Sequence, residues 1–279
     1  DRESMKLWAI SDLHVGFSEN RRQLETVTAR PDDWLIVGGD LGENLDHVKF
    51  VFDTLGPRFA KLIWVPGNHE LWVDPRAPAS DPRGEARYWM YVDHCRRSGV
   101  LCPEDPYVEW TGEGGRHLLV PMFLLYDYSF RPDEIPVENA IEWAAEAGIV
   151  AGDEVMLDPS PHAGRAEWCH ARVSLTEKRL SEAIDLPTVL INHFPLRQDI
   201  VLLPRVPRFI PWCGTRKTND WHRRYRASIV VHGHLHVRRT CRVDGVPFVD
   251  VSFGYPRERR GDRPIDDYVR QILPIPEGL

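Results

Sequence analysis

The 279-residue sequence predicts an α/β fold in which strands and helices alternate in layers. Short apolar runs alternate with helical patterns in the first third of the chain. Two β-branched runs appear in the last third. In both regions the runs stop at polar side chains that can bind metals or move protons, which a buried core rarely contains.

The first third of the chain predicts three strands and two helices. Apolar runs indicate strands at residues 6–10, 34–37 and 61–65, each followed by a polar loop. Helices are expected between them, at about 20–29 and 44–55. The second helix has apolar residues at helical spacing, namely Leu45, Val48, Val51, Phe52 and Leu55. This order of elements is typical of a βαβ layered fold.

The middle of the chain is less regular. Residues 71–84 are rich in Pro, Asp and Arg and are expected to form a loop. The patterns after this loop predict a helix at 85–97, strands at 107–110 and 117–125, and helices at 138–147 and 168–184.

The chain is expected to form one domain at residues 5–279, because no repeat or shift in composition divides it. A loop- and helix-rich insert is expected within it, at about 71–187. Residues 1–4 precede Met5, and we expect them to be disordered or left over from expression.

The last third returns to regular strands. Residues 188–191 and 228–231 are β-branched runs, each followed by histidines. Residues 237–242 and 246–252, separated by Asp244-Gly245, predict a β-hairpin.

Composition narrows the class of protein. A hydrophobic fraction of 42% and 10 Trp residues suffice for a packed core, and no apolar run is long enough to span a membrane. The five Cys are scattered and odd in number, which predicts reduced thiols in a cytoplasmic protein and argues against a thiolate zinc site. A net charge of −7 disfavours a general nucleic-acid binder.

Five predicted strands end in clusters of potential ligands. Ligands of layered α/β proteins collect beyond the carboxyl ends of the strands, so these clusters are expected to meet. A lone histidine after a strand is more often structural, but five clusters in order predict a shared metal site. The clusters are Asp12 and His14; Asp40; Asn68, His69 and Glu70; His193; and His234 and His236.

The chemistry of these side chains limits the metal. Carboxylates, imidazoles and a carboxamide suit first-row ions such as Mn²⁺, Fe or Zn²⁺, and do not suit Ca²⁺. The ligands are too many for one ion with an open position. Two ions about 3.5–4 Å apart, bridged by one carboxylate, would use them.

The motifs resemble those of the calcineurin-like metallophosphoesterases in order and spacing. The matching residues are Asp12-x-His14, Gly39-Asp40, Gly67-Asn68-His69-Glu70, His193 and Gly233-His234-x-His236. The resemblance implies a two-sheet β-sandwich of mixed sheets flanked by helices, with a dinuclear centre at one edge.

The resemblance also implies a role for each residue of the site. His69 would stabilise the phosphoryl group or protonate the leaving oxygen, and Glu70 would orient His69. Attack on phosphorus would be in line, by a hydroxide that bridges the metals. One ion would be held by Asp12, His14, Asp40 and His236, and the other by Asp40, Asn68, His193 and His234.

Two neighbouring residues have no assigned role at this stage. His232 is expected either to support a ligand or to be structural. Asn44 lies slightly away from the usual position of a polar residue after the aspartate, so its role stays open.

Three stretches narrow the resemblance to an actinobacterial, including mycobacterial, subgroup of phosphopantetheinyl hydrolases. They are residues 63–72, 120–130 and 212–215, the last followed by Trp221-His222. This implies hydrolysis of the phosphodiester that joins 4′-phosphopantetheine to holo acyl carrier protein.

Residues 197–226 are rich in arginine and lie between two ligand loops. Such a run is usually a solvated loop, but it could also dock an acidic carrier protein, through Arg216, Lys217 and Arg223. Tyr128 and Trp212 could contact the pantetheine arm or could equally belong to the core.

Two other function classes stay open. A nuclease or a phosphodiesterase of nucleotides or cyclic nucleotides would use the same motifs, although the net charge disfavours a nuclease. A non-enzymatic scaffold on this fold would be expected to lose His69 or several ligands, and this chain keeps them.

Overall fold

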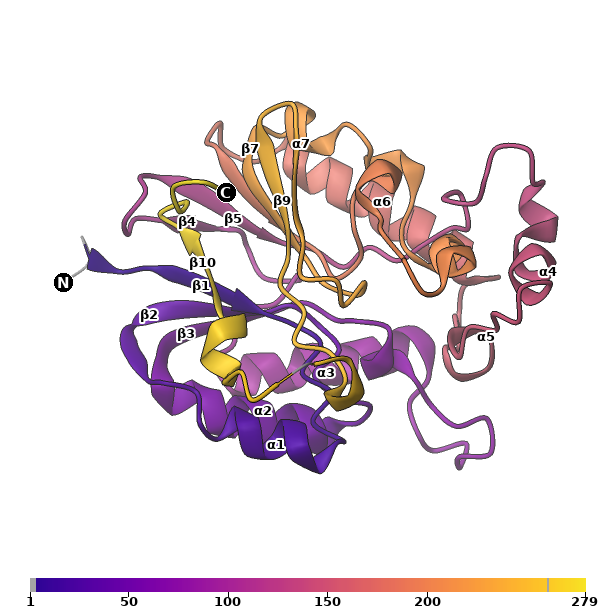
Figure 1. The fold of residues 1–279 in the computed structure, drawn as a ribbon, viewed down its shortest axis with the longest axis horizontal. Helices are drawn as coiled ribbons and strands as arrows, with labels where there is room; N and C mark the ends of the chain where they lie inside the picture. Colours follow the sequence, from indigo (N-terminus) through magenta and orange to yellow (C-terminus); the bar gives the residue numbers. More distant parts are fainter. Residues whose placement is uncertain (1–3, 260) are drawn as a thin grey trace.

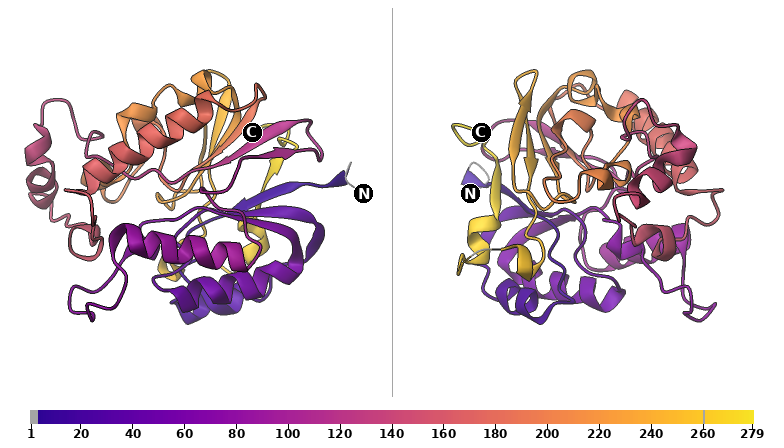
Figure 2. Two further views of the ribbon diagram at one scale, coloured as in Figure 1. Left: turned by 180° about the vertical axis from the view of Figure 1, so that it is seen from behind. Right: turned by 45° about the vertical axis from the view of Figure 1, so that its right-hand side comes forward.

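Two β-sheets lie face to face, and helices cover the outer face of each (Figures 1 and 2). The computed structural model describes residues 4–259 and 261–279, so the prediction for residues 1–4 falls mostly outside the described residues. The layers are therefore helices, sheet, sheet and helices, which confirms the predicted two-sheet α/β sandwich.

The first sheet is mixed. Strands β1, β2 and β3 are parallel, and β10 pairs antiparallel with β1. Within the described residues its order is β10-β1-β2-β3. The strands are β1 (Leu7–Ile10), β2 (Arg30–Val37), β3 (Phe59–Trp64) and β10 (Arg270–Leu273).

The second sheet is also mixed. Its order, within the same residues, is β4-β5-β6-β7-β9-β8, with antiparallel pairing only for β4 and β8 at the edges. The strands are β4 (Val108–Trp110), β5 (His117–Pro121), β6 (Thr188–Ile191), β7 (Ala227–His232), β8 (Thr240–Val243) and β9 (Val246–Asp250).

The helices divide between the two outer faces (Figure 1). The first face carries α1 (Ser18–Leu24), α2 (Leu45–Leu55) and α3 (Gly84–Arg97). The second face carries α6 (Arg165–Ser181) and α7 (Trp221–Arg224). Helices α4 (Ala140–Ala145) and α5 (Asp153–Met156) project from one end of the sandwich (Figure 2).

Both faces of the central strands are buried, which explains why the sequence shows continuous apolar runs there. Ala9, Ile36 and Ile63 of the first sheet pack with Val189 and Val231 of the second in one inter-sheet cluster. A second, larger cluster lies between the sheets and the helices.

The predicted strands and helices are confirmed, although several of them differ in their bounds. The helix expected at 20–29 ends at Leu24, and the strand expected at 117–125 ends at Pro121. The helix expected at 138–147 is split into a 3₁₀ turn and the short α4. Strand β10 was not predicted, because only two of its four residues are apolar and buried.

Most of residues 71–187, predicted to form an insert, belong to the layers of the sandwich. They supply β4 and β5 to the second sheet, and α3 and α6 cover the two faces. The segment that carries α4 and α5 projects from the layers, as does the loop that precedes α3 (Figure 1). No helix in the described part of the chain is long and apolar enough to cross a membrane.

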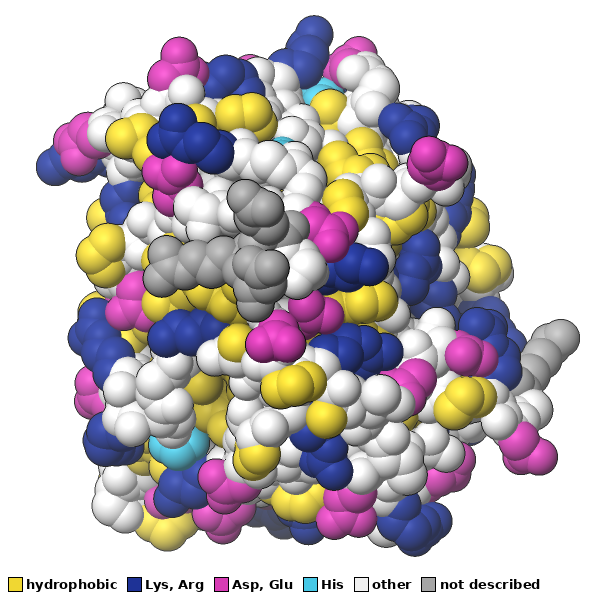
Figure 3. All heavy atoms as spheres, turned by 90° about the vertical axis from the view of Figure 1, so that its left-hand side faces the viewer, with side chains coloured by type: hydrophobic (Ala, Val, Ile, Leu, Met, Phe, Trp, Pro, Cys, Tyr) yellow, Lys and Arg dark blue, Asp and Glu magenta, His cyan; other side chains and the backbone are white. Residues whose placement is uncertain are grey.

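Charges of both signs are interspersed on the face from which β1 starts (Figure 3). Among the described residues that Figure 3 colours, no broad cationic surface of the kind that a nucleic-acid backbone requires is present on that face.

Candidate metal centre

The predicted ligands meet at one edge of the sandwich, beyond the ends of β1, β2, β3, β6 and β7. Asp12 and Asp40 follow parallel neighbours of the first sheet, whereas His193 and His234 follow neighbours of the second. Three groups have potential ligand atoms within 4.8 Å of one another: Asp12, His14 and His236; His14, Asp40 and His69; and Asp40, His193 and His234.

Asp40 lies at the middle of these groups. Its Oδ2 is 3.4 Å from His193 Nε2, 3.8 Å from His14 Nε2 and 3.9 Å from His69 Nε2. Asp12 Oδ1 is 3.0 Å from His236 Nε2. An oxygen shared in this way among several imidazoles is suited to bridge two ions.

Three buried atoms at this edge have no hydrogen-bond partner among the described residues: His14 Nε2, His193 Nε2 and Asn68 Oδ1. Leaving a buried polar group unpaired costs about 1–3 kcal/mol. Three such atoms among the predicted ligands are explained if each has a metal partner. The donor set contains no thiolate, and it fits first-row transition ions.

Hydrogen bonds to the backbone and to a carboxylate determine which nitrogen each histidine presents. His193 Nδ1 lies 2.9 Å from Gly38 O, and His236 Nδ1 lies 2.7 Å from Glu258 Oε2, which leaves Nε2 for a metal in both. His234 is reversed, because its Nε2 lies 3.0 Å from Trp212 O. Such partners orient metal-binding histidines and set their tautomer.

Asp153 of α5 orients the amide of Asn68. Asn68 Nδ2 donates to Asp153 Oδ1 at 2.8 Å, so the amide oxygen turns away toward the centre. The carboxylate is itself held by the Trp72 indole at 2.6 Å and the Tyr126 hydroxyl at 2.8 Å. The sequence does not identify Asp153, because this residue lies in an irregular segment 85 residues from Asn68.

The ligand loops adopt an uncommon backbone conformation. A positive φ at a non-glycine residue costs roughly 1–3 kcal/mol and clusters at functional sites. Five of the seven predicted ligands have one: Asp12 (53°), His14 (41°), Asp40 (53°), His234 (72°) and His236 (56°). The bends direct successive side chains toward one point beyond the sheet edge.

Two motif glycines allow the loops to approach one another. A Cβ on Gly67 would collide with Asp40 Oδ1, and a Cβ on Gly233 would collide with Asp12 Oδ2. Any larger residue at either position would displace an aspartate of the centre.

The prediction that Glu70 orients His69 is wrong. Within the described residues no hydrogen bond joins the two side chains; Glu70 instead accepts from the backbone N–H groups of Asp40 at 2.9 Å and Gly67 at 3.2 Å. It therefore fixes the ligand loops. The His69 ring stacks on Trp72, and its Nδ1 lies 3.3 Å from Glu43 Oε1. The orienting carboxylate is Glu43, which the sequence analysis did not single out.

The aspartates control the protonation of the nearby histidines. Burial lowers the pKa of His193, but Asp40 and Asp12 outweigh it and raise that pKa to about 10. The pKa of His234 falls to about 3, chiefly because the ring is buried and His193 lies beside it. Protons and a metal ion therefore compete for His193.

A cavity of about 360 Å³ opens beside the centre. One wall comes from the arginine-rich loop and another from the chain that follows β9. The sequence motifs do not identify these wall residues, because no motif specifies their side chains. They are Leu203, Arg205, Val206, Phe209, Leu235, Tyr255, Arg257 and Glu258.

The aromatic residues predicted to bind substrate lie elsewhere. Trp212 is fully buried, and its indole donates to Glu154 Oε1 at 2.9 Å. The Tyr128 hydroxyl donates to the same oxygen at 2.6 Å. Neither residue lines the cavity beside the centre. Of the two predicted alternatives for Trp212, contact with the pantetheine arm or a place in the core, the structure therefore supports the core.

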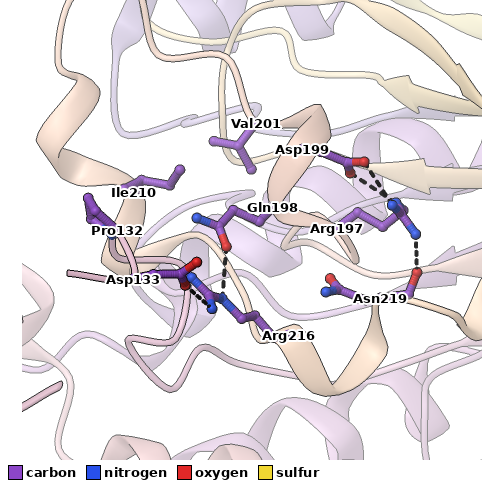
Figure 4. A pocket seen from close by; sticks show the side chains of 9 residues that line it. All are labelled: Pro132, Asp133, Arg197, Gln198, Asp199, Val201, Ile210, Arg216 and Asn219. Carbon is purple, nitrogen blue, oxygen red and sulfur yellow. Dashed lines mark hydrogen bonds and ion pairs between the residues drawn. The ribbon is translucent and has the colours of Figure 1, made fainter. Parts of the chain in front are cut away.

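The predicted basic residues are also outside this cavity. Arg216 lines a separate hollow of about 710 Å³, where it pairs with Asp133 at 2.5 Å and with Gln198 at 2.9 Å (Figure 4). Arg223 lies 3.5 Å from Asp244, and Lys217 is exposed.

His232 and Asn44 are both outside the predicted ligand set. His232 is buried behind the centre, with Nδ1 3.1 Å from Gly233 O, and no metal-ligand group within the described residues includes it. Asn44 caps α2 by accepting from His47 N at 2.9 Å. Asn44 therefore has a structural role.

Comparison with known proteins agrees with this geometry. A sequence model of the family described as calcineurin-like phosphoesterase matches residues 5–238. The acyl-carrier-protein phosphodiesterase PptH of Mycobacterium tuberculosis is 49% identical over 275 residues, which cover 97% of this chain and 84% of that protein.

One solved structure closely matches the fold of this chain. The crystal structure of phosphopantetheinyl hydrolase (PptH) from Mycobacterium tuberculosis matches with a TM-score of 0.91 and 47% identity, covering 99% of both chains. A dimetal phosphatase from Danio rerio matches with a TM-score of only 0.40 and 13% identity, over 89% of this chain and 87% of that one.

Proposed function

Because the chain belongs to the calcineurin-like phosphoesterase family, we propose that it hydrolyses the phosphodiester joining 4′-phosphopantetheine to holo acyl carrier protein. The observation that carries this proposal is the 49% identity, over 97% of the chain, to a protein named as an acyl-carrier-protein phosphodiesterase. The grouping of Asp and His ligands at one edge supports the chemistry.

Two first-row ions, Mn²⁺ or Fe with Zn²⁺ as a further candidate, would be held by the seven predicted ligands, three of which have an unpaired buried ligand atom within the described residues. When bound, they supply Lewis-acid activation of water and neutralise charge on the phosphoryl oxygens. The proposed sets are Asp12, His14, Asp40 and His236 for one ion, and Asp40, Asn68, His193 and His234 for the other.

His69 is proposed to protonate the leaving oxygen. Its ring lines the cavity beside Asp40. Burial opposes a proton on His69, but Asp40 and Glu43 outweigh it and raise its pKa. In the reaction the bond from phosphorus to the serine oxygen of the carrier protein breaks, and a bond to the water oxygen forms. The serine oxygen takes the proton, so the products are apo carrier protein and 4′-phosphopantetheine.

A cytoplasmic location is part of the proposal, since acyl carrier proteins act there. The five cysteines, all within the described residues, form no disulfide, and four of them are buried. This fits a reducing compartment.

The test is intact-mass spectrometry of holo acyl carrier protein after incubation with the enzyme and Mn²⁺. We expect the mass of the carrier protein to fall by that of the phosphopantetheine arm, and His69→Ala to slow this loss. If the arm stays in place while the enzyme cleaves a nucleotide or cyclic-nucleotide diester, the alternative phosphodiesterase function replaces this one.

A further inference from the structure

A second cavity, of about 340 Å³, adjoins the one beside the metal centre. The two cavities share part of their lining, including Leu203, Arg205, Val206 and Leu235. They therefore form one continuous furrow that starts at the centre and runs between residues 202–206 and 235–238. Each part has the volume of a small-ligand pocket, roughly 300–1,000 Å³.

The furrow is open to solvent, and aliphatic side chains form most of its exposed surface, with Arg205, Arg238 and Glu258 beside them. Leu202 is 43% exposed and Val206 is 38% exposed, although both are large aliphatic residues. Leu203, Pro204 and Val237 extend the same surface. A contiguous set of exposed apolar side chains next to a reactive centre indicates a ligand-binding groove.

We propose that this furrow binds the pantetheine arm of the substrate. The inference rests on the proposed function and deepens it. The arm is joined covalently to the reacting phosphorus, so its first atoms must lie at the centre, where the furrow begins. Those first atoms include two methyl groups on one carbon, which match the aliphatic side chains of Leu203 and Val206.

The larger hollow around Arg216 is a poorer match to the arm (Figure 4). It shares no lining residue with the cavity beside the centre. Its charged residues also neutralise one another, since Arg197 pairs with Asp199 at 2.7 Å and Arg216 with Asp133. The arm is uncharged beyond its phosphate and would gain little from such groups.

The test uses Leu202→Asp, because Leu202 lines the furrow but not the cavity at the centre. The matched control is Leu175→Asp on α6, where the leucine is 40% exposed. Both variants and the wild type are assayed on bis(p-nitrophenyl) phosphate, with 4′-phosphopantetheine or inorganic phosphate as inhibitor. The KM for holo acyl carrier protein is measured in parallel.

We expect Leu202→Asp to weaken inhibition by 4′-phosphopantetheine about tenfold, the loss for one buried leucine contact. Inhibition by phosphate and turnover of the aryl diester should stay within about twofold, and the latter shows that the variant folds. Leu175→Asp should match the wild type in every assay.

Unchanged inhibition by 4′-phosphopantetheine and an unchanged KM in Leu202→Asp would overturn the furrow assignment alone. The proposed function fails by a different result, namely a wild-type enzyme that leaves holo acyl carrier protein intact.

Discussion

Asp40 connects more groups of the centre than any single histidine does. Its Oδ2 faces His14, His69 and His193, and its Oδ1 accepts from the backbone N–H of His69 at 2.9 Å. It therefore couples both proposed ligand sets to His69, the proposed catalytic histidine.

Asp40→Asn should lose metal and activity together, because a neutral amide is a poor bridge between two cations. The measurements are metal content by mass spectrometry after dialysis and turnover of bis(p-nitrophenyl) phosphate. Asp133→Asn, at an exposed carboxylate in the separate hollow, is the matched control. Full activity in Asp40→Asn would remove Asp40 from the bridging position.

His69 has a different role from its neighbours, since its nitrogens face two carboxylates and it lines the cavity. His69→Ala should keep both ions while turnover of holo acyl carrier protein falls by about 10²–10⁴-fold. Metal content and single-turnover rates check this, with His94→Ala on α3 as control. Loss of the ions along with activity would instead make His69 a ligand.

At the scale of elements, the short α5 contributes to the centre through Asp153. Asp153→Ala should release the Asn68 amide and weaken one ion about 10–100-fold, as expected for a residue that orients a ligand. A metal titration followed by activity measures this. Asp158→Ala should bind metal normally, because within the described residues Asp158 accepts hydrogen bonds only from Ser160. Equal metal affinity in the two variants would contradict the role of α5.

The sequence predicted elements well where a periodic pattern was strong. Strand β6 was placed at its observed bounds, since all four of its residues are apolar or β-branched and buried. Strand β10 was missed because it is short and owes its conformation to pairing with β1. Local patterns carry no information on a partner so distant in the chain.

The same limit applies to the site. The ligands were predictable because each follows a strand in a short motif. Asp153, Glu43 and Glu258 were not, because their partners Asn68, His69 and His236 are distant in the sequence. Arg205 belonged to a run of arginines, and nothing in the run distinguished the one that faces the cavity from those in ion pairs.

At the scale of the molecule, the centre joins the two sheets. Asp12, Asp40 and Asn68 follow strands of the first sheet, whereas His193, His234 and His236 follow strands of the second. A bound ion would therefore tie the two sheets together and stabilise the folded chain.

Removal of metal should lower the melting temperature by several degrees. The measurement is calorimetry with and without EDTA, followed by recovery on addition of Mn²⁺. Asp40→Asn should melt at the same temperature with and without EDTA. If the wild-type protein has the same melting temperature with and without EDTA, the ions do not stabilise the junction of the two sheets.

The distribution of paired and unpaired arginines predicts where an acidic carrier protein docks. Arg216 and Arg223, the residues suggested by sequence, are occupied by Asp133 and Asp244. Arg205 and Arg257 line the cavity, and within the described residues neither has an ion pair; Arg257 lies over the Tyr255 ring.

Arg205→Glu should therefore raise the KM for holo acyl carrier protein more than Arg223→Glu does, and added salt should reduce the difference. Both variants should lose less activity on bis(p-nitrophenyl) phosphate than on holo acyl carrier protein, because that diester lacks the acidic protein surface that Arg205 would contact. The measurement is the KM of each variant for holo acyl carrier protein, from steady-state kinetics at two ionic strengths. A larger effect at Arg223 would place the carrier protein over α7, away from the cavity that Arg205 lines.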